Sequence, residues 1–450
     1  MSTREGLDGL RDELVDQLCA AGVVRDERVA WALRSVPRHL FVPGEPELAY
    51  RDEAVPTKWA PDGRPISSSS QPGVMAVMLE QLEAGCGQRV LEIGTGTGYN
   101  AALLAHLVGE TGQVITMDIE EDLVEQARRN LSAANVGGVS VVCADGGAGW
   151  PAGAPYDRIM LTVGAWDVAP AWVNQLAAGG RLVLPLSLRG VQRSVALEPT
   201  GEYLTSVSVT PCGFMPLRGQ MARPESIRPL GDEPGMFIAF DGEQRLDTAV
   251  LCSALGQPAE LLSTGIQVSP AEVFDGLALW LALHEADSGV LFAVGAAIER
   301  GLVPPLLSFP RETATSVLLT EQAMAALVRL NQEGNDQNWS NTFELGVRAF
   351  GTGGHQLAQR LRAAVHQWHA SGRPATAGLR IRAYPRGSTT DNESAAIIDK
   401  HYNRLVLDWP VPGTGVESFH GRASVGPPDR DPAQVSRRMS STQSSIRAHQ

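Results

Sequence analysis

The sequence lacks the features of secreted, metal-binding and membrane-spanning proteins. Its five cysteines are far apart and form no Cys-x-x-Cys pair, and no histidines stand at metal-ligand spacing. This usage is typical of reduced cytoplasmic cysteines and predicts no metal centre. The apolar runs at 276–283 and 289–298 are separated by His284, Glu285 and Asp287, so neither is expected to span a bilayer. The N-terminal segment is charged and has no signal-peptide core. We therefore expect a cytoplasmic protein without a membrane partner.

An excess of positive charge is also missing. The chain has 37 lysines and arginines against 50 aspartates and glutamates, a formal net charge of -13. Proteins that bind the phosphate backbone of nucleic acids usually carry a basic face, so this balance argues against a nucleic-acid partner. At 450 residues the chain is too long for one ordinary core, which favours two or three domains.

A regular alternation of helix and strand patterns runs through the first half of the chain. The expected helices are 74–82, 99–109, 120–135 and 169–177, and the expected strands are 89–94, 112–118, 139–145, 156–163 and 179–186. Strands that alternate with helices form a parallel sheet covered on both faces. Ligands of such sheets bind beyond the carboxyl ends of the strands. The residues directly after each strand are therefore the first candidates for a site.

Outside this region the patterns are weaker. Helical spacing at 10–35 predicts one or two packed helices, and a stretch rich in Pro, Gly and Arg at 221–234 predicts a linker. The region 235–412 mixes helical patterns with strand-like pieces, and we expect a separate mixed α/β domain there. Its expected helices are 320–334 and 353–372, and its expected strands are 289–298, 379–385 and 403–409. The polar stretch 413–450 is expected to be disordered. Residues 1–220 then form the first domain.

A glycine-rich turn follows the first expected strand. It reads Glu92-Ile93-Gly94-Thr95-Gly96-Thr97-Gly98. Glycines let the backbone turn sharply and approach a ligand beside the N-terminus of the next helix. A dinucleotide-binding fingerprint needs another Gly or Ala where Tyr99 stands, so the spacing disfavours NAD.

Two aspartates end the next two strands. Asp118 stands where a carboxylate can bind both ribose hydroxyls of a nucleoside, and its alternative role is to cap the helix that begins near Glu120. Asp145, followed by Gly146, can meet an adenine amino group or can simply form an Asp-Gly turn. Together with the glycine turn, Asp118 favours a ribose-containing cofactor.

Three motifs resemble one enzyme family. "ADGGAGWPAGAPYDRI" at 144–159 is similar to the signature of protein-L-isoaspartate (D-aspartate) O-methyltransferases. "VPRHLFVP" at 36–43, followed by "AYRD" at 49–52, resembles that family's N-terminal segment, and "LEIGTGTGYNAALLA" at 91–105 resembles its S-adenosylmethionine loop. The likeness is collinear over residues 10–200. In the signature, Pro155 and Tyr156 are expected to be structural, and Trp150 either packs on the turn or borders the pocket.

The resemblance implies a fold, a cofactor and a reaction. The fold is α/β, a class I S-adenosylmethionine-dependent methyltransferase with a Rossmann-like doubly wound sheet, here with an additional mixed α/β C-terminal domain. The methyl group moves from a sulfonium to a side-chain carboxylate of a peptide, which needs no His or Lys base because the carboxylate is already ionised at pH 7. The residues expected to bind the cofactor S-adenosyl-L-methionine are Glu92, Gly94, Thr95, Gly96, Gly98, Asp118, Asp145 and Gly146.

A run of four serines supplies the candidate substrate residues. In the family, a serine just before Gln-Pro or Ala-Pro lies beside the substrate carboxylate, and here Ser70 precedes Gln71-Pro72. Ser69 and Ser68 are the neighbouring candidates, because the spacing from Ile66 to Gln71 is longer than in the family's repair enzymes. The alternative is that the run is a flexible polar loop. After the fourth strand the chain departs from the family by adding Trp166 and Asp167, which we expect to reshape the peptide-binding lip.

The second half resembles an extended branch of the family. "CGFMPLRG" at 212–219 and the long C-terminal region look like enzymes found beside ribosomally made peptide natural products such as lanthipeptides, lasso peptides and graspetides. That resemblance implies methylation of an aspartate in a modified precursor peptide, with collapse of the ester to a succinimide that either persists or hydrolyses to isoaspartate. Repair of isoaspartyl residues in damaged proteins, or non-catalytic peptide binding on the same fold, are the alternatives. The extra domain either recognises the peptide or is an oligomerisation or stabilising unit. Arg218 either pairs with a substrate carboxylate or fixes a loop.

Overall fold

The computed structural model describes residues 4–60, 65–223, 227–241, 245–257, 260–309, 312–330, 341–389 and 395–409. The stretch 413–450 that was expected to be disordered lies outside these residues. The chain begins with α1 (Arg4–Ala20) and α2 (Glu27–Ser35), as the helical spacing predicts. The short turns η1 (Arg38–Leu40) and η2 (Pro46–Tyr50) follow and lead into a two-stranded antiparallel sheet of β1 (Val55–Trp59) and β2 (Pro65–Ser69).

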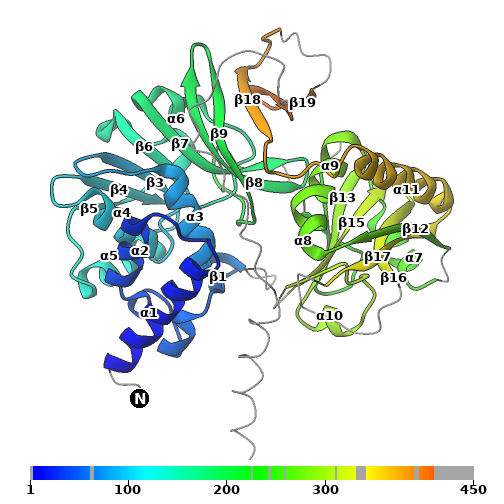
Figure 1. Cartoon of the computed structure of the whole chain (residues 1–450), viewed down its shortest axis with the longest axis horizontal. Helices are drawn as coiled ribbons and strands as arrows, with labels where there is room; N and C mark the ends of the chain where they lie inside the picture. Colours follow the sequence, from blue (N-terminus) through cyan, green and yellow to red (C-terminus); the bar gives the residue numbers. More distant parts are fainter. Residues whose placement is uncertain are drawn as a thin grey trace, which may run out of the picture. The chain divides into compact units, whose positions relative to one another are not determined.

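A parallel five-stranded sheet forms the centre of the first half (Figure 1). Its order is β5-β4-β3-β6-β7, and each neighbouring pair is parallel. The strands are β3 (Arg89–Ile93), β4 (Gln113–Asp118), β5 (Val139–Cys143), β6 (Tyr156–Leu161) and β7 (Leu176–Leu188). The connecting helices are α3 (Pro72–Leu82), α4 (Tyr99–Val108), α5 (Glu121–Ala133) and the short α6 (Pro170–Asn174). The predicted alternation and the parallel sheet are confirmed.

Antiparallel strands extend this sheet beyond β7. β8 (Val191–Thr200) and β9 (Tyr203–Cys212) continue it as a meander. β18 (Arg380–Pro385) then pairs with β9, and β20 (Asn403–Asp408) and β19 (Ala396–Asp399) complete the ten strands. In Figure 1, the orange β18 lies beside the green β9. The strands expected at 379–385 and 403–409 are therefore confirmed as strands, and they belong to the same sheet as the glycine turn.

The region between β9 and β18 builds a second, antiparallel sheet. Its order is β10-β11-β13-β15-β16-β17-β12, with β14 (Leu307–Phe309) paired to β15. The strands are β10 (Ile227–Pro229), β11 (Met236–Phe240), β12 (Leu261–Val268), β13 (Ser288–Val294), β15 (Glu312–Leu319), β16 (Ala323–Leu330) and β17 (Phe343–Gly351). One face packs against α11 (Gly354–Ala370) and α9 (Ala278–His284), and the other packs against α7 (Thr248–Leu255) and α10 (Ala296–Glu299). The short α8 (Pro270–Glu272) and the π-turn η5 (Val273–Leu277) precede α9.

The helix expected at 320–334 is wrong. Residues 323–330 form the interior strand β16. Alanine, leucine and methionine favour a helix, which explains the expectation. The strand is buried on both faces, however: Met324 and Ala326 pack with α7, whereas Ala325 and Leu327 pack with α11. A strand covered on both sides is apolar throughout and shows no alternation, so its periodicity cannot be told from that of a buried helix.

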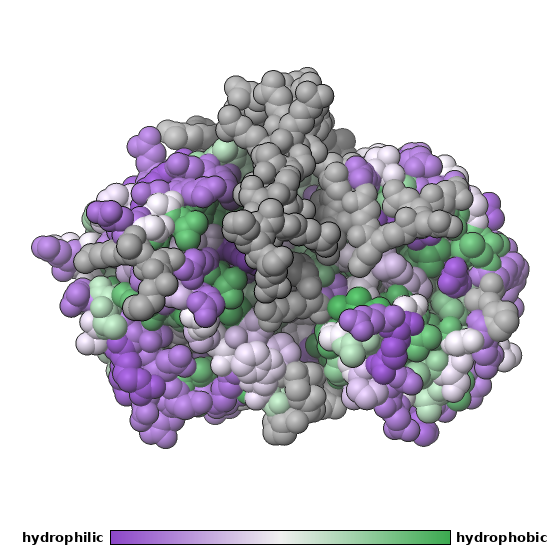
Figure 2. Space-filling view, turned by 90° about the horizontal axis from the view of Figure 1, so that it is seen from below, coloured by the Kyte–Doolittle hydropathy of each residue, from purple (hydrophilic) through white to green (hydrophobic). Residues whose placement is uncertain are grey.

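One face of the described surface carries both polar and apolar side chains. On the face shown in Figure 2, hydrophilic side chains dominate the outer rim and hydrophobic ones occur in separate patches. None of the helices in the described part of the chain has the length and apolar character needed to cross a bilayer.

Candidate functional site

The glycine turn lies between β3 and α4, at the carboxyl edge of the parallel sheet. Gly94, Gly96 and Gly98 have positive φ angles of 105°, 51° and 85°. A Cβ on Gly94 would lie 2.7 Å from the Oγ1 of Thr162, and one on Gly98 would lie 3.2 Å from the Cβ of Ala127. The backbone conformation disfavours side chains at all three glycines, and the close neighbours also leave little space for them at Gly94 and Gly98. Without side chains, the backbone of the turn can closely approach a ligand at the edge of the sheet.

Asp118, the last residue of β4, is bonded to the glycine turn itself. Its Oδ2 accepts the backbone N–H of Gly96 at 3.0 Å, and its Oδ1 accepts that of Glu120 at 3.2 Å. Burial raises the pKa of this carboxyl above its usual value, while the bonds from Gly96 and Glu120 and the charge of Arg218 oppose the rise. A carboxylate accepts through about four lone-pair sites, so two backbone bonds leave capacity for the hydroxyls of a ribose. Asp118 does not cap α5, because the N-cap of that helix is Glu120 and no side chain caps it. The ligand-acceptor role weighed for Asp118 stays a prediction.

Glu92 lies behind the turn. Its carboxyl group is fully buried and accepts hydrogen bonds from Asn100 Nδ2 at 2.7 Å and from Thr116 Oγ1 at 2.6 Å. The Oγ1 of Thr116 also lies 2.7 Å from that of Thr95, which links Glu92 to the glycine turn. Burial raises the pKa of Glu92 to about 7. The structure thus places Glu92 and Thr95 in a buried network that supports the turn.

Asp145 and Gly146 lie at the end of β5. The Oδ1 of Asp145 accepts the N–H of Gly147 at 2.8 Å, and its Oδ2 accepts the N–H of Gln220 at 2.7 Å. Gly146 is buried, and a Cβ there would lie only 2.3 Å from Ile93 Cγ2. The segment 215–221 after β9 therefore covers this edge of the sheet. Sequence reasoning singled out Arg218 in this segment and missed the contact of Gln220 with Asp145.

An ion-pair cluster joins three separate segments at this edge. Glu120 is paired with Lys58 of β1 at 2.6 Å and with Arg218 of the 215–221 segment. Lys58 also contacts Asp122 at 2.7 Å, at the start of α5. Between the two uses weighed for Arg218, the structure shows the loop-fixing one. The pKa of Glu120 is lowered, mainly by the hydrogen bonds from Lys58 and Arg218.

The serine run forms β2 and its continuation, next to the glycine turn. A Cβ on Gly96 would lie 3.7 Å from the backbone oxygen of Ser68, so the two segments are in close contact. The hydroxyl of Ser67 accepts from Thr57 Oγ1 at 3.1 Å, and that of Ser69 lies 3.5 Å from a guanidinium nitrogen of Arg38. Ser67 and Ser69 are buried, whereas Ser68 and Ser70 are partly exposed. Alternation along a strand therefore separates Ser69 from Ser68 and Ser70.

The loop after β6 meets the turn between β19 and β20. Asp167 is fully buried and accepts hydrogen bonds from Tyr402 N at 2.6 Å and Asn403 Nδ2 at 2.7 Å. The ring of Trp166 lies 5.3 Å from the Nζ of Lys400, which donates to Ser187 O at 3.0 Å. The two residues that depart from the family pattern are therefore the ones that contact the C-terminal strands.

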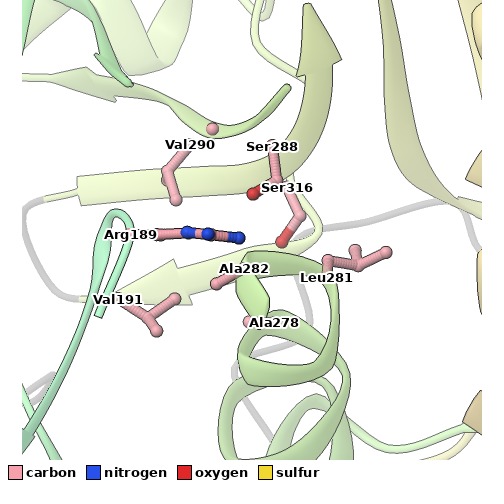
Figure 3. Close-up of a pocket in the computed structure, with 9 residues that line it drawn as sticks. Arg189, Val191, Ala278, Leu281, Ala282, Ser288, Val290 and Ser316 are labelled. Carbon is pink, nitrogen blue, oxygen red and sulfur yellow. The ribbon is translucent and has the colours of Figure 1, made fainter. Parts of the chain in front are cut away.

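The signature residues have structural neighbours as expected. Tyr156 is buried and its hydroxyl donates to Trp150 O at 2.6 Å, and Trp172 Nε1 donates to Gly146 O at 2.8 Å. Trp150 is partly buried and packs against the core beneath the sheet. A cavity shown in Figure 3 is lined by Arg189 and by residues of α9, β13 and β15, so it lies apart from the glycine turn. The guanidinium of Arg189 donates to Leu283 O and Ile397 O, which indicates that Arg189 has a structural role.

Comparison with known proteins identifies the first half of the chain. The family model for protein-L-isoaspartate(D-aspartate) O-methyltransferase matches residues 10–222. The protein-L-isoaspartate O-methyltransferase of Methanoculleus marisnigri is 40% identical over 220 residues, which are 49% of this chain and 96% of that protein. That of Methanopyrus kandleri is 40% identical over 220 residues, 48% of this chain and 95% of that protein.

One solved protein-L-isoaspartate O-methyltransferase covers 83% of this chain and 96% of its own chain, at 22% identity and a TM-score of 0.45. The two relatives from Methanoculleus marisnigri and Methanopyrus kandleri match this chain over nearly their whole length, and the match covers about half of this chain. Enzymes of this family are carboxyl methyltransferases that use S-adenosylmethionine, and the class I methyltransferase fold expected from the motifs is the one observed. The chain belongs to the protein-L-isoaspartate (D-aspartate) O-methyltransferase family.

Proposed function

We propose that this enzyme methylates the side-chain carboxylate of an aspartyl or isoaspartyl residue in a peptide. One observation carries the proposal: Gly96 is bonded through its N–H to Asp118 and lies against the backbone of Ser68. The segment suited to a nucleoside cofactor and the segment suited to the substrate are thus in contact at the carboxyl edge of one sheet. This is where ligands of doubly wound sheets bind.

The residues present fit S-adenosylmethionine. Asp118 would hold the ribose hydroxyls, Asp145 would meet the adenine amino group, and the backbone of Gly94, Gly96 and Gly98 leaves room for close approach. The carboxylates of Asp118 and Asp145 accept backbone N–H groups that orient them at the sheet edge. Glu92 and Thr95 would act from behind, by fixing the turn. When bound, the cofactor supplies an electrophilic methyl group on a sulfonium.

Methyl transfer to a carboxylate requires mainly that the protein position the two reacting groups. In the transfer, a substrate carboxylate oxygen forms a bond to the methyl carbon while the carbon–sulfur bond breaks, which leaves a methyl ester and a neutral thioether. The attacking carboxylate is ionised at neutral pH, so no base removes a proton. The chain's residues would then bind the peptide, exclude water and hold the oxygen in line with the methyl group. Ser70 is the residue proposed to contact the carboxylate, with Ser68 beside it.

We further propose that the substrate is a ribosomally made, modified peptide. The chain has a second sheet and a C-terminal helix, residues 227–370, beyond the part shared with its compact relatives. The strands that follow return to the first sheet and bond to Asp167 in the loop after β6. On this proposal residues 1–220 are the catalytic part and residues 235–412 recognise the peptide, with β18 to β20 of the latter joined to the catalytic sheet. A neighbouring backbone amide nitrogen would then displace methanol from the methyl ester and give a succinimide, which either persists or hydrolyses to isoaspartate.

Repair of isoaspartyl residues in damaged proteins is the second candidate. It is favoured by the 40% identity of the first half to protein-L-isoaspartate O-methyltransferases over nearly their full length. Non-catalytic peptide binding is the third, and the intact glycine turn, Asp118 and serine run argue against it.

Mass spectrometry of two incubations separates these candidates. One contains the enzyme, S-adenosylmethionine and a linear isoaspartyl peptide, and the other contains a cyclised precursor peptide from a neighbouring gene cluster. Gain of a methyl group followed by loss of methanol on the cyclised peptide alone would establish a biosynthetic enzyme. Methylation of the linear isoaspartyl peptide would establish repair. Binding of the cofactor without turnover of either peptide would favour the peptide-binding candidate.

A further inference from the structure

Arg38 is a buried cation next to the serine run. It lies in η1 within the motif "VPRHLFVP", its side chain is 1% exposed, and burial lowers its pKa. Within the described residues it forms no ion pair with a carboxylate. Burying an unpaired charge is costly unless strong hydrogen bonds replace the lost water. The acceptors of the Arg38 guanidinium therefore indicate the role of this residue.

The acceptors of Arg38 come from two segments and are backbone oxygens, with the Oγ of Ser69 in addition. On one side, the guanidinium donates to Ala49 O and, at 3.2 Å, to Glu53 O. On the other side, its Nη2 donates to Ser70 O at 2.9 Å and lies 3.5 Å from both the backbone oxygen and the Oγ of Ser69. A planar guanidinium holds several acceptors in a fixed arrangement, which a lysine ammonium does not reproduce.

A second set of hydrogen bonds, made by Asp52, holds the residues directly after Ser70. The Oδ1 of Asp52 accepts the N–H of Gly73 at 2.7 Å, and its Oδ2 accepts Gln71 Nε2 at 3.0 Å. Ser70 therefore stands between a contact with Arg38 and one with Asp52. Arg38 and Asp52 both lie in the segment before β1, so they fix the end of the serine run against the same part of the chain.

Arg38 also reaches the other half of the site. Its guanidinium carbon lies 5.8 Å from the ring centroid of Tyr99, the first residue of α4, which directly follows Gly98. Tyr99 is buried, and Arg38 opposes the rise of the tyrosine pKa that burial causes. One cation thus contacts both the serine run and the helix that starts at the glycine turn.

We propose that Arg38 is a positioning residue that sets the place of Ser70 relative to the glycine turn, through its bonds to the Ser69 and Ser70 backbone and its contact with Tyr99. The assignment of a role in turnover rests on the proposed methyltransfer. The structural part, that Arg38 orders the end of the serine run, does not.

The test compares Arg38→Lys with Arg193→Lys. Arg193 is equally buried and donates to the backbone oxygens of Phe274 and Asp275, away from the serine run, so it is a matched control for loss of a buried guanidinium. We expect Arg38→Lys to lower kcat about 10- to 100-fold, as misplacement by about 1 Å does. Its affinity for S-adenosylhomocysteine should stay within about two-fold of the parent protein. Amide hydrogen exchange over residues 65–73 should become faster in Arg38→Lys only.

Arg193→Lys should lower the melting temperature to a similar degree and leave kcat unchanged. Equal kcat losses in the two variants, or an unchanged exchange pattern at 65–73, would overturn the proposal. If Arg38→Lys does not fold, Asp52→Asn loosens the same segment from the other side of Ser70 and should show the same loss of kcat without loss of cofactor affinity. If the parent protein methylates neither peptide, the proposed function fails, whereas the exchange comparison still decides the role of Arg38.

Discussion

Arg218 is ion-paired with Glu120, which lies two residues after Asp118 on the same turn. The pair joins the segment that follows β9 to the start of α5, directly beside the carboxylate proposed to hold the ribose. Gln220 N, bonded to Asp145 Oδ2 at 2.7 Å, anchors the same segment at the next strand. The segment 215–221 is therefore held against both carboxylates of the proposed cofactor site.

Arg218→Ala should weaken cofactor binding moderately. The pair is partly exposed, and such pairs contribute about 0.2–1 kcal/mol, which corresponds to a loss of affinity of up to about five-fold. Calorimetric titration with S-adenosylhomocysteine measures the change. Arg300→Ala, which removes a partly exposed pair with Glu233 at 3.1 Å, is the control and should leave the affinity unchanged. An unchanged affinity in Arg218→Ala would mean that the segment does not help to enclose the cofactor.

Asp118→Asn should affect cofactor binding much more strongly. The amide removes the charge and presents N–H groups where the turn of Gly96 and the ribose hydroxyls both require an acceptor. We expect a loss of about 1.5–3 kcal/mol, or at least about ten-fold in the dissociation constant. Asp157→Asn is the control, because Asp157 accepts the N–H of Arg89 at 2.8 Å at the opposite end of β3. Equal effects of the two substitutions would argue against the ribose assignment.

The central sheet could be predicted from the sequence because its pattern is local. Each strand is a short apolar run and each helix has its own spacing, so the order from β3 to β7 could be read off residue by residue. The carboxyl edge followed from the parallel sheet, and it brought Gly96 and Asp118 together as expected. The pairing of β18 with β9 could not be predicted, because contacts between residues near 205 and 382 leave no local trace.

Within the candidate site, the residues that sequence reasoning missed act through the backbone. Arg38 and Asp52 belong to recognised motifs, but the sequence assigned them no role. Among their partners are the backbone oxygen of Ser70 and the backbone N–H of Gly73, which side-chain patterns do not reveal. A charged residue inside an otherwise apolar motif was the one available signal. Lys58 was missed for a different reason: its partners, Glu120 and Asp122, lie on another element far along the chain.

The three candidate serines should respond differently to substitution by alanine. Ser70→Ala should lower kcat and leave cofactor affinity nearly unchanged, because Ser70 is proposed to contact the substrate carboxylate. Ser69→Ala should mainly lower stability, by up to about 1 kcal/mol, because its hydroxyl faces Arg38. Ser68→Ala, next to Gly96, should raise the KM for the peptide more than it changes stability. Steady-state kinetics and thermal melting of the three variants give the comparison. A kcat loss confined to Ser69→Ala would move the proposed contact to the buried face of the strand.

Glu92 should make the folded state less stable as the pH rises. Its pKa is raised from 4.5 to about 7 by burial, so between these values the folded protein binds a proton that the unfolded chain has released. Stability falls with pH wherever the folded state binds more protons. The contribution is therefore fully present below about pH 4.5 and is lost as the pH rises through about 7. A shift of this size corresponds to about 3 kcal/mol.

Glu92→Gln should remove this dependence. A glutamine can accept from Asn100 and donate to Thr116, whose hydroxyl then donates to Thr95, so the network keeps its bonds in the neutral form. Glu312 also has its pKa raised to about 7 by burial, so the difference between parent and variant, rather than the slope of the parent alone, reports on Glu92. The measurement is urea unfolding at several values between pH 5 and 8. We expect the free energy of unfolding of the variant to fall less than that of the parent across this range, and parallel curves would show that Glu92 is ionised throughout. Because the network ends at the glycine turn, the same titration should also make cofactor affinity change near pH 7 in the parent and not in the variant.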